Sequence, residues 1–419
     1  MEPKVRFKGF EGEWKKVKFL EIFEFLKNNS LSRAELSSKG DFINIHYGDI
    51  LIKYGDLVNI QNEELTYIRD CQIGQTLYNI CSLQNGDIIF ADAAEDYSVG
   101  KCSEIVNIGN NKVVSGLHTI PCRPLITFAQ GYLGHYINSN SYHNQLLPLI
   151  QGSKISSISK KTLSQTSVFV PSYEEQQTIA SYFRTLDAKL QASAKKVESL
   201  KKLKSASLVA MFPQQGETTP KVRFKGFEGE WKTPSIGDVF ELRNGYTPSK
   251  IVKEFWEGGT IPWFRMEDIR MNGGFLKDAL QHITPLAVKG AGLFEKNSII
   301  LATTATIGVH AMLIADSLAN QRFTNFKVRK SLSDEYIDEF IYYSFFKIDE
   351  WSKNNTNSGG LLSVNMPLLV KQSFLTPCKE EQQAIATFFR SLDRKIALET
   401  ARLEKLKQIK LACLDKMFV

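Results

Sequence analysis

The sequence predicts an α+β chain in which two mixed α/β bodies are joined by two long antiparallel helices that pair like a coiled coil. Two internal duplications lead to this fold class. Residues 174–212 and 380–418 align without a gap at a constant offset of 206 positions, and both copies open with Glu-Glu-Gln-Gln. The twelve residues 3–14 recur letter for letter at 220–231. A chain that repeats one plan is expected to have an internal pseudo-two-fold repeat.

Each of the two long duplicated stretches is expected to form one continuous helix. Apolar residues recur at three- and four-residue steps, which is the narrow stripe of a long packed helix. The stripes consist of Ile179, Phe183, Leu186, Leu190, Val197 and Leu200, and of Ile385, Phe389, Leu392, Ile396, Leu403 and Leu406. At a rise of about 1.5 Å per residue, each helix is roughly 55 Å long. A helix of this length with one apolar seam needs a partner, and its own copy is the nearest candidate.

These landmarks divide the chain into five segments. They are a first body at 1–173, a helix at 174–212, a linker at 213–219, a second body at 220–379 and a second helix at 380–419. Because the connections are short, we expect the helices to be antiparallel, with one body at each end. The bodies share little sequence outside the duplicated segments. This favours two modules that do the same kind of job on different targets.

The first body is expected to be rich in strands. Strands are predicted at 87–90, 117–120 and 167–170, where β-branched and aromatic residues lie between turns that contain Gly and Asn. Trp14 and Trp231 end the two copies of the short duplicated segment. We interpret both as structural residues that pack where each body begins.

Composition favours a cytoplasmic globular protein. The chain is 43% hydrophobic and 23% charged, and six dispersed cysteines show no metal-ligand spacing, so reduced thiols are expected. A net charge of +7 weakly favours an anionic partner such as nucleic acid. No apolar run reaches membrane-spanning length, so no membrane partner is expected.

No catalytic motif is present in the sequence. The chain lacks a Gly-rich phosphate loop, a G-x-G-x-x-G motif and the Asn/Asp-Pro-Pro-aromatic loop of amino-methylating methyltransferases. Its histidines show no metal-ligand spacing. An acidic cluster at Asp92, Glu95 and Asp96 is more typical of a solvated loop than of a metal site. We therefore expect neither a catalytic site nor a bound metal.

Together these motifs resemble the specificity subunit of type I restriction-modification systems. The resemblance covers essentially the whole chain. Its carriers are the F-x-x-E-W elements at 10–14 and 227–231, the E-E-Q-Q-x-I-A helix starts, and the order of two bodies and two helices. The second body adds Asn244 to Ser249, the stretch from Gly258 to Trp263, and Asn320-Gln321.

The resemblance implies a non-catalytic DNA reader. Each body would be a target-recognition domain that reads half of a bipartite, asymmetric sequence in double-stranded DNA. The helices would hold two methyltransferase (modification) subunits that methylate adenine, and two restriction subunits would complete an ATP-driven nuclease. S-adenosylmethionine, ATP and Mg would be bound by these partners and none by this chain. Two alternatives stay open, namely a stand-alone DNA-binding regulator and a helical scaffold that touches no DNA.

Candidate contact residues follow from residue type, since basic side chains suit phosphates and amide, basic and aromatic side chains suit base edges. The phosphate candidates are Lys154, Lys160, Lys161, Lys250 and Arg270. The base-reading candidates are Lys101 and His118 in the first body, and Tyr246, Arg265, Asn320, Gln321 and Arg322 in the second. The predicted partner interface consists of Phe183, Leu186, Leu190, Phe389, Leu392 and Ile396.

The helices are predicted to act as a ruler for the DNA target. Inserting four residues between 195 and 200, and four between 401 and 406, adds roughly 5–6 Å to each helix and nearly preserves the seam. Since DNA rises about 3.4 Å per base pair, the unread spacer should lengthen by one or two base pairs while both half-sites stay unchanged. Genome-wide mapping of methylated sites measures this. Inserting two residues, the control, rotates the seam by about 200° and should abolish activity. An unchanged spacer in the active four-residue variant would refute the ruler.

Overall fold

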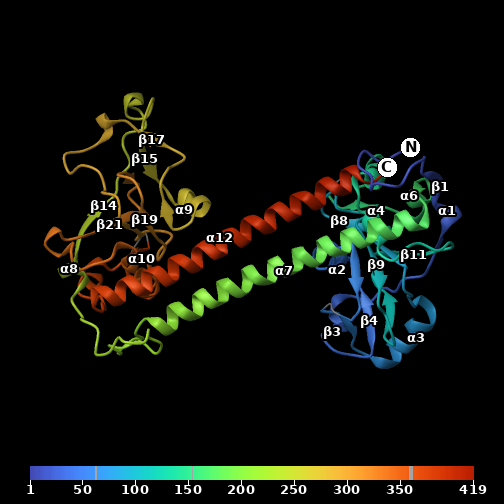
Figure 1. Cartoon of the computed structure of the whole chain (residues 1–419), viewed down its shortest axis with the longest axis horizontal. Coiled ribbons are helices and arrows are strands. Elements are labelled where there is room, and N and C mark those ends of the chain that lie inside the picture. Colours follow the sequence, from blue (N-terminus) through green and yellow to red (C-terminus); the bar gives the residue numbers. More distant parts are fainter. Residues whose placement is uncertain (62–63, 153, 358–361) are drawn as a thin grey trace. The chain divides into compact units, whose positions relative to one another are not determined.

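The computed structural model describes residues 1–61, 64–152, 154–357 and 362–419, and these form two compact units (Figure 1). Unit 1 comprises Met1–Lys195 with Thr400–Val419, and unit 2 comprises Lys196–Glu399. Each unit therefore contains one mixed α/β body and a part of each long helix. The predicted fold class is confirmed, whereas the predicted limits of the recognition domains stay a prediction.

The two long helices are continuous. Helix α7 spans Tyr173–Met211 and helix α12 spans Lys379–Lys416, so each begins one residue before its predicted start. Both carry two glutamates in the first turn, where the N-terminal helix dipole favours negative charge. Among the described residues, no helix has both the length and the apolar character needed to span a bilayer.

Ion pairs between the helices establish the antiparallel arrangement within each unit. In unit 1, Lys410 Nζ lies 2.5 Å from Asp187 Oδ1. In unit 2, Lys204 Nζ lies 2.6 Å from Asp393 Oδ1. The two pairs are equivalent in the repeat. Asp393 lies 206 positions after Asp187, and Lys410 lies 206 positions after Lys204, so each helix contributes the aspartate to one pair and the lysine to the other. In each unit a residue early in one helix thus faces a residue late in the other.

The body of unit 1 contains thirteen strands and six short α-helices among its described residues. The strands are β1 (Lys15–Lys18), β2 (Phe23–Phe25), β3 (Leu36–Ser37), β4 (Phe42–Ile45), β5 (Leu57–Asn59), β6 (Tyr67–Ile68), β7 (Ile88–Ala91), β8 (Ala93–Ala94), β9 (Cys102–Val106), β10 (Lys112–Ser115), β11 (Thr119–Pro124), β12 (Ser156–Ser157) and β13 (Ser167–Val170). The helices are α1 (Phe19–Ile22), α2 (Tyr47–Ile52), α3 (Cys71–Cys81), α4 (Tyr132–Ile137), α5 (Asn140–Leu146) and α6 (Lys160–Ser164), with 3-10 turns η1 (Arg33–Glu35) and η2 (Leu147–Leu149).

The body of unit 2 follows a similar order. Its strands are β14 (Phe240–Asn244), β15 (Ile261–Phe264), β16 (Phe275–Leu276), β17 (His282–Ile283), β18 (Ile299–Ala302), β19 (His310–Leu313), β20 (Leu318–Ala319), β21 (Phe323–Val328), β22 (Thr356–Asn357) and β23 (Ser363–Val364). Its helices are α8 (Ile236–Val239), α9 (Met266–Asn272), α10 (Asp338–Asn354) and α11 (Met366–Leu369), with 3-10 turns η3 (Lys253–Phe255), η4 (Pro285–Ala287) and η5 (Lys330–Leu332).

Both bodies contain the same five-stranded sheet. Its order is β2-β11-β7-β9-β5 in unit 1 and β14-β21-β18-β19-β16 in unit 2, and in both cases only the last pair of strands is parallel. Helix α4 packs on β9 and helix α10 packs on β19. A second, smaller sheet holds a parallel pair in each unit, β4 with β10 and β15 with β20. The repeat therefore extends into bodies whose sequences have diverged.

Two of the three strands predicted for the first body agree closely with the structure, at β7 and β13. The strand predicted at 117–120 begins only at Thr119. The reason is the backbone of His118, whose φ of 53° is left-handed and does not fit an extended strand. All six cysteines are free thiols, as expected.

An aromatic cluster in each unit joins the body to the ends of the long helices. In unit 1, the ring of Phe418 contacts those of Trp14, Tyr132, Tyr136 and Phe183 at centroid distances of 5.5–6.4 Å. In unit 2, Phe212 takes the place of Phe418 and contacts Trp231, Phe340, Phe346 and Phe389. The structural role predicted for the two tryptophans is confirmed, since both are almost fully buried.

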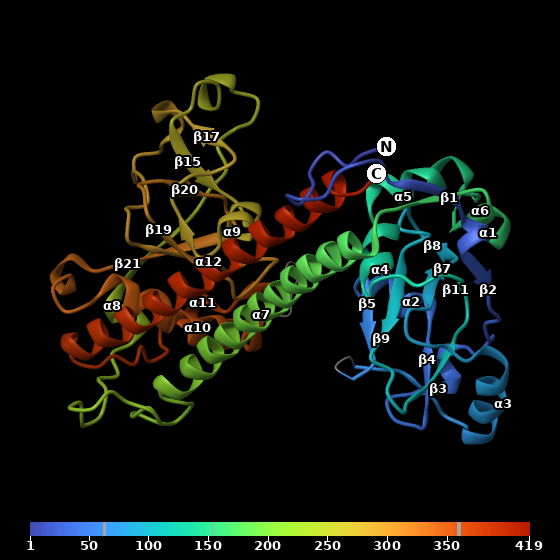
Figure 2. The same ribbon diagram turned by 45° about the vertical axis from the view of Figure 1, so that its right-hand side comes forward.

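The short duplicated segment connects both long helices within each unit. In unit 1, Arg6 donates two hydrogen bonds to the carboxylate of Glu175, at 2.7 and 2.8 Å, in the first turn of α7. Val5 N–H donates to the carbonyl oxygen of Lys416 at the end of α12. Unit 2 repeats these contacts with Arg223 on Glu381 and Val222 on Ala210. The N- and C-termini consequently lie side by side in unit 1 (Figures 1 and 2).

Replacing either arginine should destabilise its own unit. Glu175 is 2% exposed, so Arg6→Ala leaves a buried carboxylate without its cation. Because the arginine is itself 15% exposed, water offsets part of the loss, and we expect a cost of about 2 kcal/mol in the free energy of unfolding. Denaturant titration measures this, with Arg223→Ala as the equivalent change in unit 2. Lys8→Ala, which removes an exposed charge from the same segment, is the control. Equal stability of Arg6→Ala and Lys8→Ala would contradict the expectation.

Candidate nucleic-acid interface

Parts of the three stretches singled out in the second body meet at one place, which, with the residues that follow them, we call the unit 2 corner (residues 244–249, 263–265 and 320–322). Trp263 Nε1 donates to the carbonyl oxygen of Tyr246 at 3.0 Å. Tyr246 N–H donates to Ala319 O at 2.9 Å, and Thr247 Oγ1 donates to Gln321 Oε1 at 2.5 Å. A Cβ atom on Gly245 would collide with two carbonyl oxygens of the facing strand, so only glycine fits there.

The same backbone arrangement recurs in unit 1, where it defines the unit 1 corner (residues 28–30, 44–46 and 116–118). Gly116 N–H donates to Ile45 O at 2.9 Å, as Asn320 N–H donates to Phe264 O at 3.0 Å in unit 2. Asn29 N–H donates to Ser115 O, matching the bond from Tyr246 N–H to Ala319 O. The two corners share hydrogen bonds made by the main chain and differ in their side chains.

Several predicted base readers are occupied by contacts inside the unit 2 body. The hydroxyl of Tyr246 donates to Ala287 O at 3.1 Å and accepts from Lys289 N–H at 2.9 Å. Arg265 forms an ion pair with Glu267 at 2.9 Å. These two bonds give Tyr246 a structural role within the corner, and its contact with a base stays a prediction.

The amides at the end of the unit 2 corner are partly occupied. The side-chain oxygen of Asn320 accepts from Arg322 N–H at 3.0 Å, and that of Gln321 accepts from Thr247. Arg322 itself is exposed, and the described residues show no hydrogen bond or ion pair made by its guanidinium. Arg322 is therefore the most available of the five candidates in this unit.

Of the two base-reading candidates in unit 1, one is held inside the body and the other is exposed. Lys101 Nζ donates to the carbonyl oxygens of Leu51 and Tyr54 at 3.0 and 3.1 Å, and burial lowers its pKa. These bonds hold its ammonium group inside the body, so they do not favour the predicted contact of Lys101 with DNA, which stays a prediction. His118 lies in the unit 1 corner with its side chain 51% exposed, and its Nδ1 lies 3.1 Å from Asp92 Oδ1.

The sequence analysis missed His46, which corresponds in the fold to Arg265. Each residue directly follows a strand of the parallel pair and precedes a short helix, α2 or α9. His46 Nδ1 accepts from Gly48 N–H at 3.2 Å. Burial, and then the charge of Arg33, lowers the pKa of His46 to about 4, so its imidazole is neutral near pH 7. No sequence motif marks this residue, and only strand pairing reveals its equivalence to Arg265.

Most of the predicted phosphate contacts are free at the surface. The side chains of Lys154, Lys161, Lys250 and Arg270 are exposed, and no ion pair is recorded for them among the described residues. Lys160 is also exposed, but its ammonium group donates to Leu26 O at 3.0 Å and lies 5.5 Å from the ring centroid of Phe25. Lys160 therefore has a local structural role besides any contact with an anion.

Four of the six residues of the predicted partner interface lie in the interior of the chain. Phe183, Leu186, Phe389 and Leu392 are buried within the chain, so they pack mainly in its own core, although Leu186 also lines a groove at the surface. Leu190 and Ile396 are half-buried, and their role as partner contacts stays a prediction.

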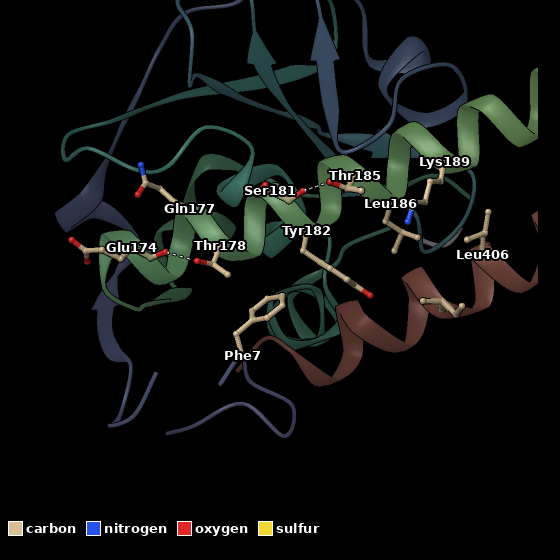
Figure 3. A pocket seen from close by; sticks show the side chains of 11 residues that line it. Phe7, Glu174, Gln177, Thr178, Ser181, Tyr182, Thr185, Leu186, Lys189 and Leu406 are labelled. Carbon is tan, nitrogen blue, oxygen red and sulfur yellow. Dashed lines mark hydrogen bonds between the residues drawn. The ribbon is translucent and has the colours of Figure 1, made fainter. Parts of the chain in front are cut away.

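The helix pair in unit 1 has a groove of about 740 Å³ on its exposed surface. Tyr182 and Leu186 reach into it from α7, with Phe7 and Leu406 on the facing side (Figure 3). Its other lining residues are Glu174, Gln177, Thr178, Ser181, Thr185, Lys189 and Ile409. The groove is apolar along its floor and polar along its α7 rim.

Comparison with known proteins identifies the family. The family model described as "Type I restriction modification DNA specificity domain" matches residues 11–202 and 228–408, which is most of the chain. The chain belongs to this family. The two matched stretches correspond to the two halves of the internal repeat, so both corners lie in specificity domains.

Curated relatives match parts of this specificity-domain chain. The EcoprrI specificity subunit of Escherichia coli is 46% identical over 158 residues, covering 38% of this chain and 39% of the relative. The MjaIX specificity subunit of Methanocaldococcus jannaschii is 30% identical over 195 residues, covering 45% and 44%. The chain thus matches less than half the length of each of these two relatives.

Solved structures share the fold over the whole chain. The S subunit of a type I restriction-modification system from M. genitalium has a TM-score of 0.58 at 14% identity and covers 100% of this chain and 99% of its own. A chain from a structure on complex assembly and conformational transition of the type I system has a TM-score of 0.59 at 17% identity, with coverages of 97% and 98%. At these identities the likeness establishes the fold.

The residues that come together as possible metal ligands are not those of the acidic cluster at Asp92, Glu95 and Asp96. Asp92 faces His118, whereas Asp96 accepts from Ser98 N–H. Of the described residues, only Asp56, His135 and Asp187 bring three groups of ligand type together. This site already holds a cation, because the ammonium group of Lys410 lies 2.7 Å from Asp56 and 2.5 Å from Asp187.

The Lys410 network links the body of unit 1 to both long helices. His135 Nδ1 lies 2.9 Å from Asp56 Oδ2. Burial favours the neutral form of Asp56, but the hydrogen bond with His135 and the charge of Lys410 outweigh it and lower the pKa of this carboxyl. Burial likewise opposes the charge of Lys410, and the two aspartates outweigh it and raise the pKa of the amine. The network thus places one ammonium group between two carboxylates, with the ring of His135 beside them.

Proposed function

We propose that this protein is the DNA sequence-recognition subunit of a type I restriction-modification complex. Each body would read one half of a bipartite, asymmetric target in double-stranded DNA. The observation that carries the proposal is the contrast within the repeat. The duplicated segments and the main-chain bonds of the corners are the same in both units, while the side chains at the corners differ. A repeated frame with different exposed side chains suits two modules that read two different half-sites.

The proposal assigns the chemistry to partner subunits. Two methyltransferase subunits would methylate adenine with S-adenosylmethionine, and two restriction subunits would cleave DNA with ATP and Mg. The chain itself would bind DNA and the partners in the cytoplasm and would carry no catalytic group.

Electrostatics supports DNA as the target. The chain carries a net charge of +7, and Lys154, Lys161, Lys250 and Arg270 extend from the two bodies without recorded ion pairs among the described residues. Contacts of this kind bind phosphates and position a protein on the duplex, whereas groups at the corners are suited to base edges.

The test is expression with a methyltransferase subunit from the same host, followed by mapping of methylated adenines. We expect a single bipartite motif. Lys154→Ala with Lys161→Ala should leave this motif unchanged, weaken binding and reduce the salt-dependence slope by about 2, because two phosphate contacts are lost. The matched control is Lys4→Ala with Lys8→Ala, which removes two exposed charges from the same unit. A complex that binds no DNA specifically would refute the proposed function, and an altered motif would place the lysines at base edges.

The groove on the helix pair favours the multi-subunit assembly over a stand-alone regulator. We propose that it docks an apolar helix of a methyltransferase subunit. Ile409, which lines the groove, is 37% exposed, and the residue at its position in the repeat, Leu203 in unit 2, is 50% exposed. Exposed apolar residues at matching places in both halves suit one copy of the same partner on each unit.

Charged substitutions at these two positions should each remove one partner. Ile409→Asp and Leu203→Asp should each lower the methyltransferase count from two to one, and the double variant should bind none, because burying an unpaired carboxylate at an interface is strongly unfavourable. Native mass spectrometry counts the subunits. Leu20→Asp, an exposed leucine on α1 that receives the same charge, is the control. Retention of two methyltransferase subunits by the double variant would exclude the groove as the docking site.

A further inference from the structure

The two units place one exposed polar side chain at the same backbone position. His118 is the last residue before β11, and Arg322 is the last before β21. The carbonyl oxygen of His118 accepts from Asp92 N–H at 3.1 Å, directly after β7. The carbonyl oxygen of Arg322 accepts from Thr303 N–H at 2.9 Å, directly after β18. Since β7 and β18 hold the same place in the sheet order, the two residues are equivalent in the repeated fold.

In each unit, the base-reading candidates whose side chains bond inside the body can be set aside, and the candidate that remains lies at this position. In unit 2, Tyr246, Arg265, Asn320 and Gln321 all use side-chain atoms for contacts inside the body. Arg322 is the predicted reader whose side chain shows no such contact among the described residues. In unit 1, Lys101 is held by two carbonyl oxygens, and the exposed candidate is His118. Neither elimination uses information from the other unit.

The backbone at His118 points to a role for its side chain. Its φ of 53° lies in the left-handed region, which is uncommon for residues other than Gly, and Asn, Asp and His adopt it more often than the rest. Glycine would satisfy this turn without strain. A strained residue with an exposed functional side chain is typical of binding sites.

The chemistry at the equivalent position differs between the units. The guanidinium of Arg322 is a fork of donors, which matches the two acceptors O6 and N7 on the major-groove edge of guanine. Nδ1 of the His118 imidazole lies 3.1 Å from the carboxylate of Asp92, so Nε2 is the ring nitrogen left for a partner outside the body. A single ring nitrogen pairs with one polar group on a base edge, whereas the arginine fork pairs with two.

We propose that the residue before β11 and before β21 is a specificity-determining position of each module. Arg322 reads a guanine in the half-site of unit 2. His118, whose ring lies against Asp92, reads one base in the half-site of unit 1. This inference rests on the proposed function and adds to it the position in each module that reads a base, with guanine as the base in unit 2.

Substitution of Arg322 tests the inference in unit 2. A glutamine side chain pairs with adenine N6 and N7, so Arg322→Gln should replace one guanine by adenine in one half of the methylated motif and leave the other half unchanged. Lys330→Gln, which makes the same change of charge at an exposed lysine on η5, is the control and should leave the motif intact. Mapping of methylated adenines reads out all positions together.

Substitution of His118 tests unit 1 with a second measurement. His118→Gly removes both the imidazole and the backbone strain, so it should raise the temperature of unfolding while relaxing one base of the other half-site. Asn107→Gly, at another exposed left-handed residue of the same unit, should leave the motif unchanged. A purely structural role of His118 would alter stability without altering the motif, and that result would overturn the inference for unit 1.

Binding to short duplexes covers the case in which a variant no longer supports methylation. Arg322→Ala should lower the affinity for the guanine-containing site by about tenfold or more and bind all four bases at that position equally. A uniform loss on all four duplexes, with guanine still preferred, would show a phosphate contact and overturn the inference. An unchanged motif in Arg322→Gln would also overturn it, while wild-type methylation of a bipartite motif would leave the proposed function standing.

Discussion

The ion pair between the short duplicated segment and the first turn of a long helix is the interaction on which each unit depends. Glu175 and Glu381 are almost completely buried, and a carboxylate in that position is stable only beside a cation. The forks of Arg6 and Arg223 supply two parallel hydrogen bonds each. Because the same segments also bond to the last turn of the opposite helix, one contact region holds a helix start, a helix end and the beginning of a body.

Polar pairs on the helix seam determine the register of the helices within each unit. An apolar stripe alone permits several alignments that differ by a helical turn. Asp187 with Lys410, and Asp393 with Lys204, remove this freedom, since a shift of one turn would separate half-buried charges. The two units differ in the further side chains that contact this aspartate–lysine pair. Unit 1 adds Asp56 and His135, whereas unit 2 adds the hydroxyl of Tyr343, which donates to Asp393 at 2.9 Å.

This arrangement separates the frame from the reading surface. The helices, the duplicated segments and the sheet order are the same in both units, and the main-chain bonds of the corners are repeated with them. The exposed side chains at the corners make few contributions to the core, so they can change at little cost in stability. His118 and Arg322 illustrate this, because two chemically different side chains stand on one conserved backbone position within the repeat.

The sequence by itself determined the fold class, the antiparallel helices and the buried role of Trp14 and Trp231. These features follow from exact repetition and from apolar periodicity, which are properties of neighbouring residues. Tertiary structure decided which candidates are available. Tyr246 and Lys101 are residue types that suit DNA contacts, but their side chains bond to carbonyl groups of residues far away in the sequence. Phe183 and Phe389 lie in the core. Strand pairing alone aligns His118 with Arg322, because the diverged bodies no longer share a sequence offset. Whether a side chain faces solvent depends on hydrogen bonds and packing between residues far apart in the chain, and a linear pattern does not contain that information.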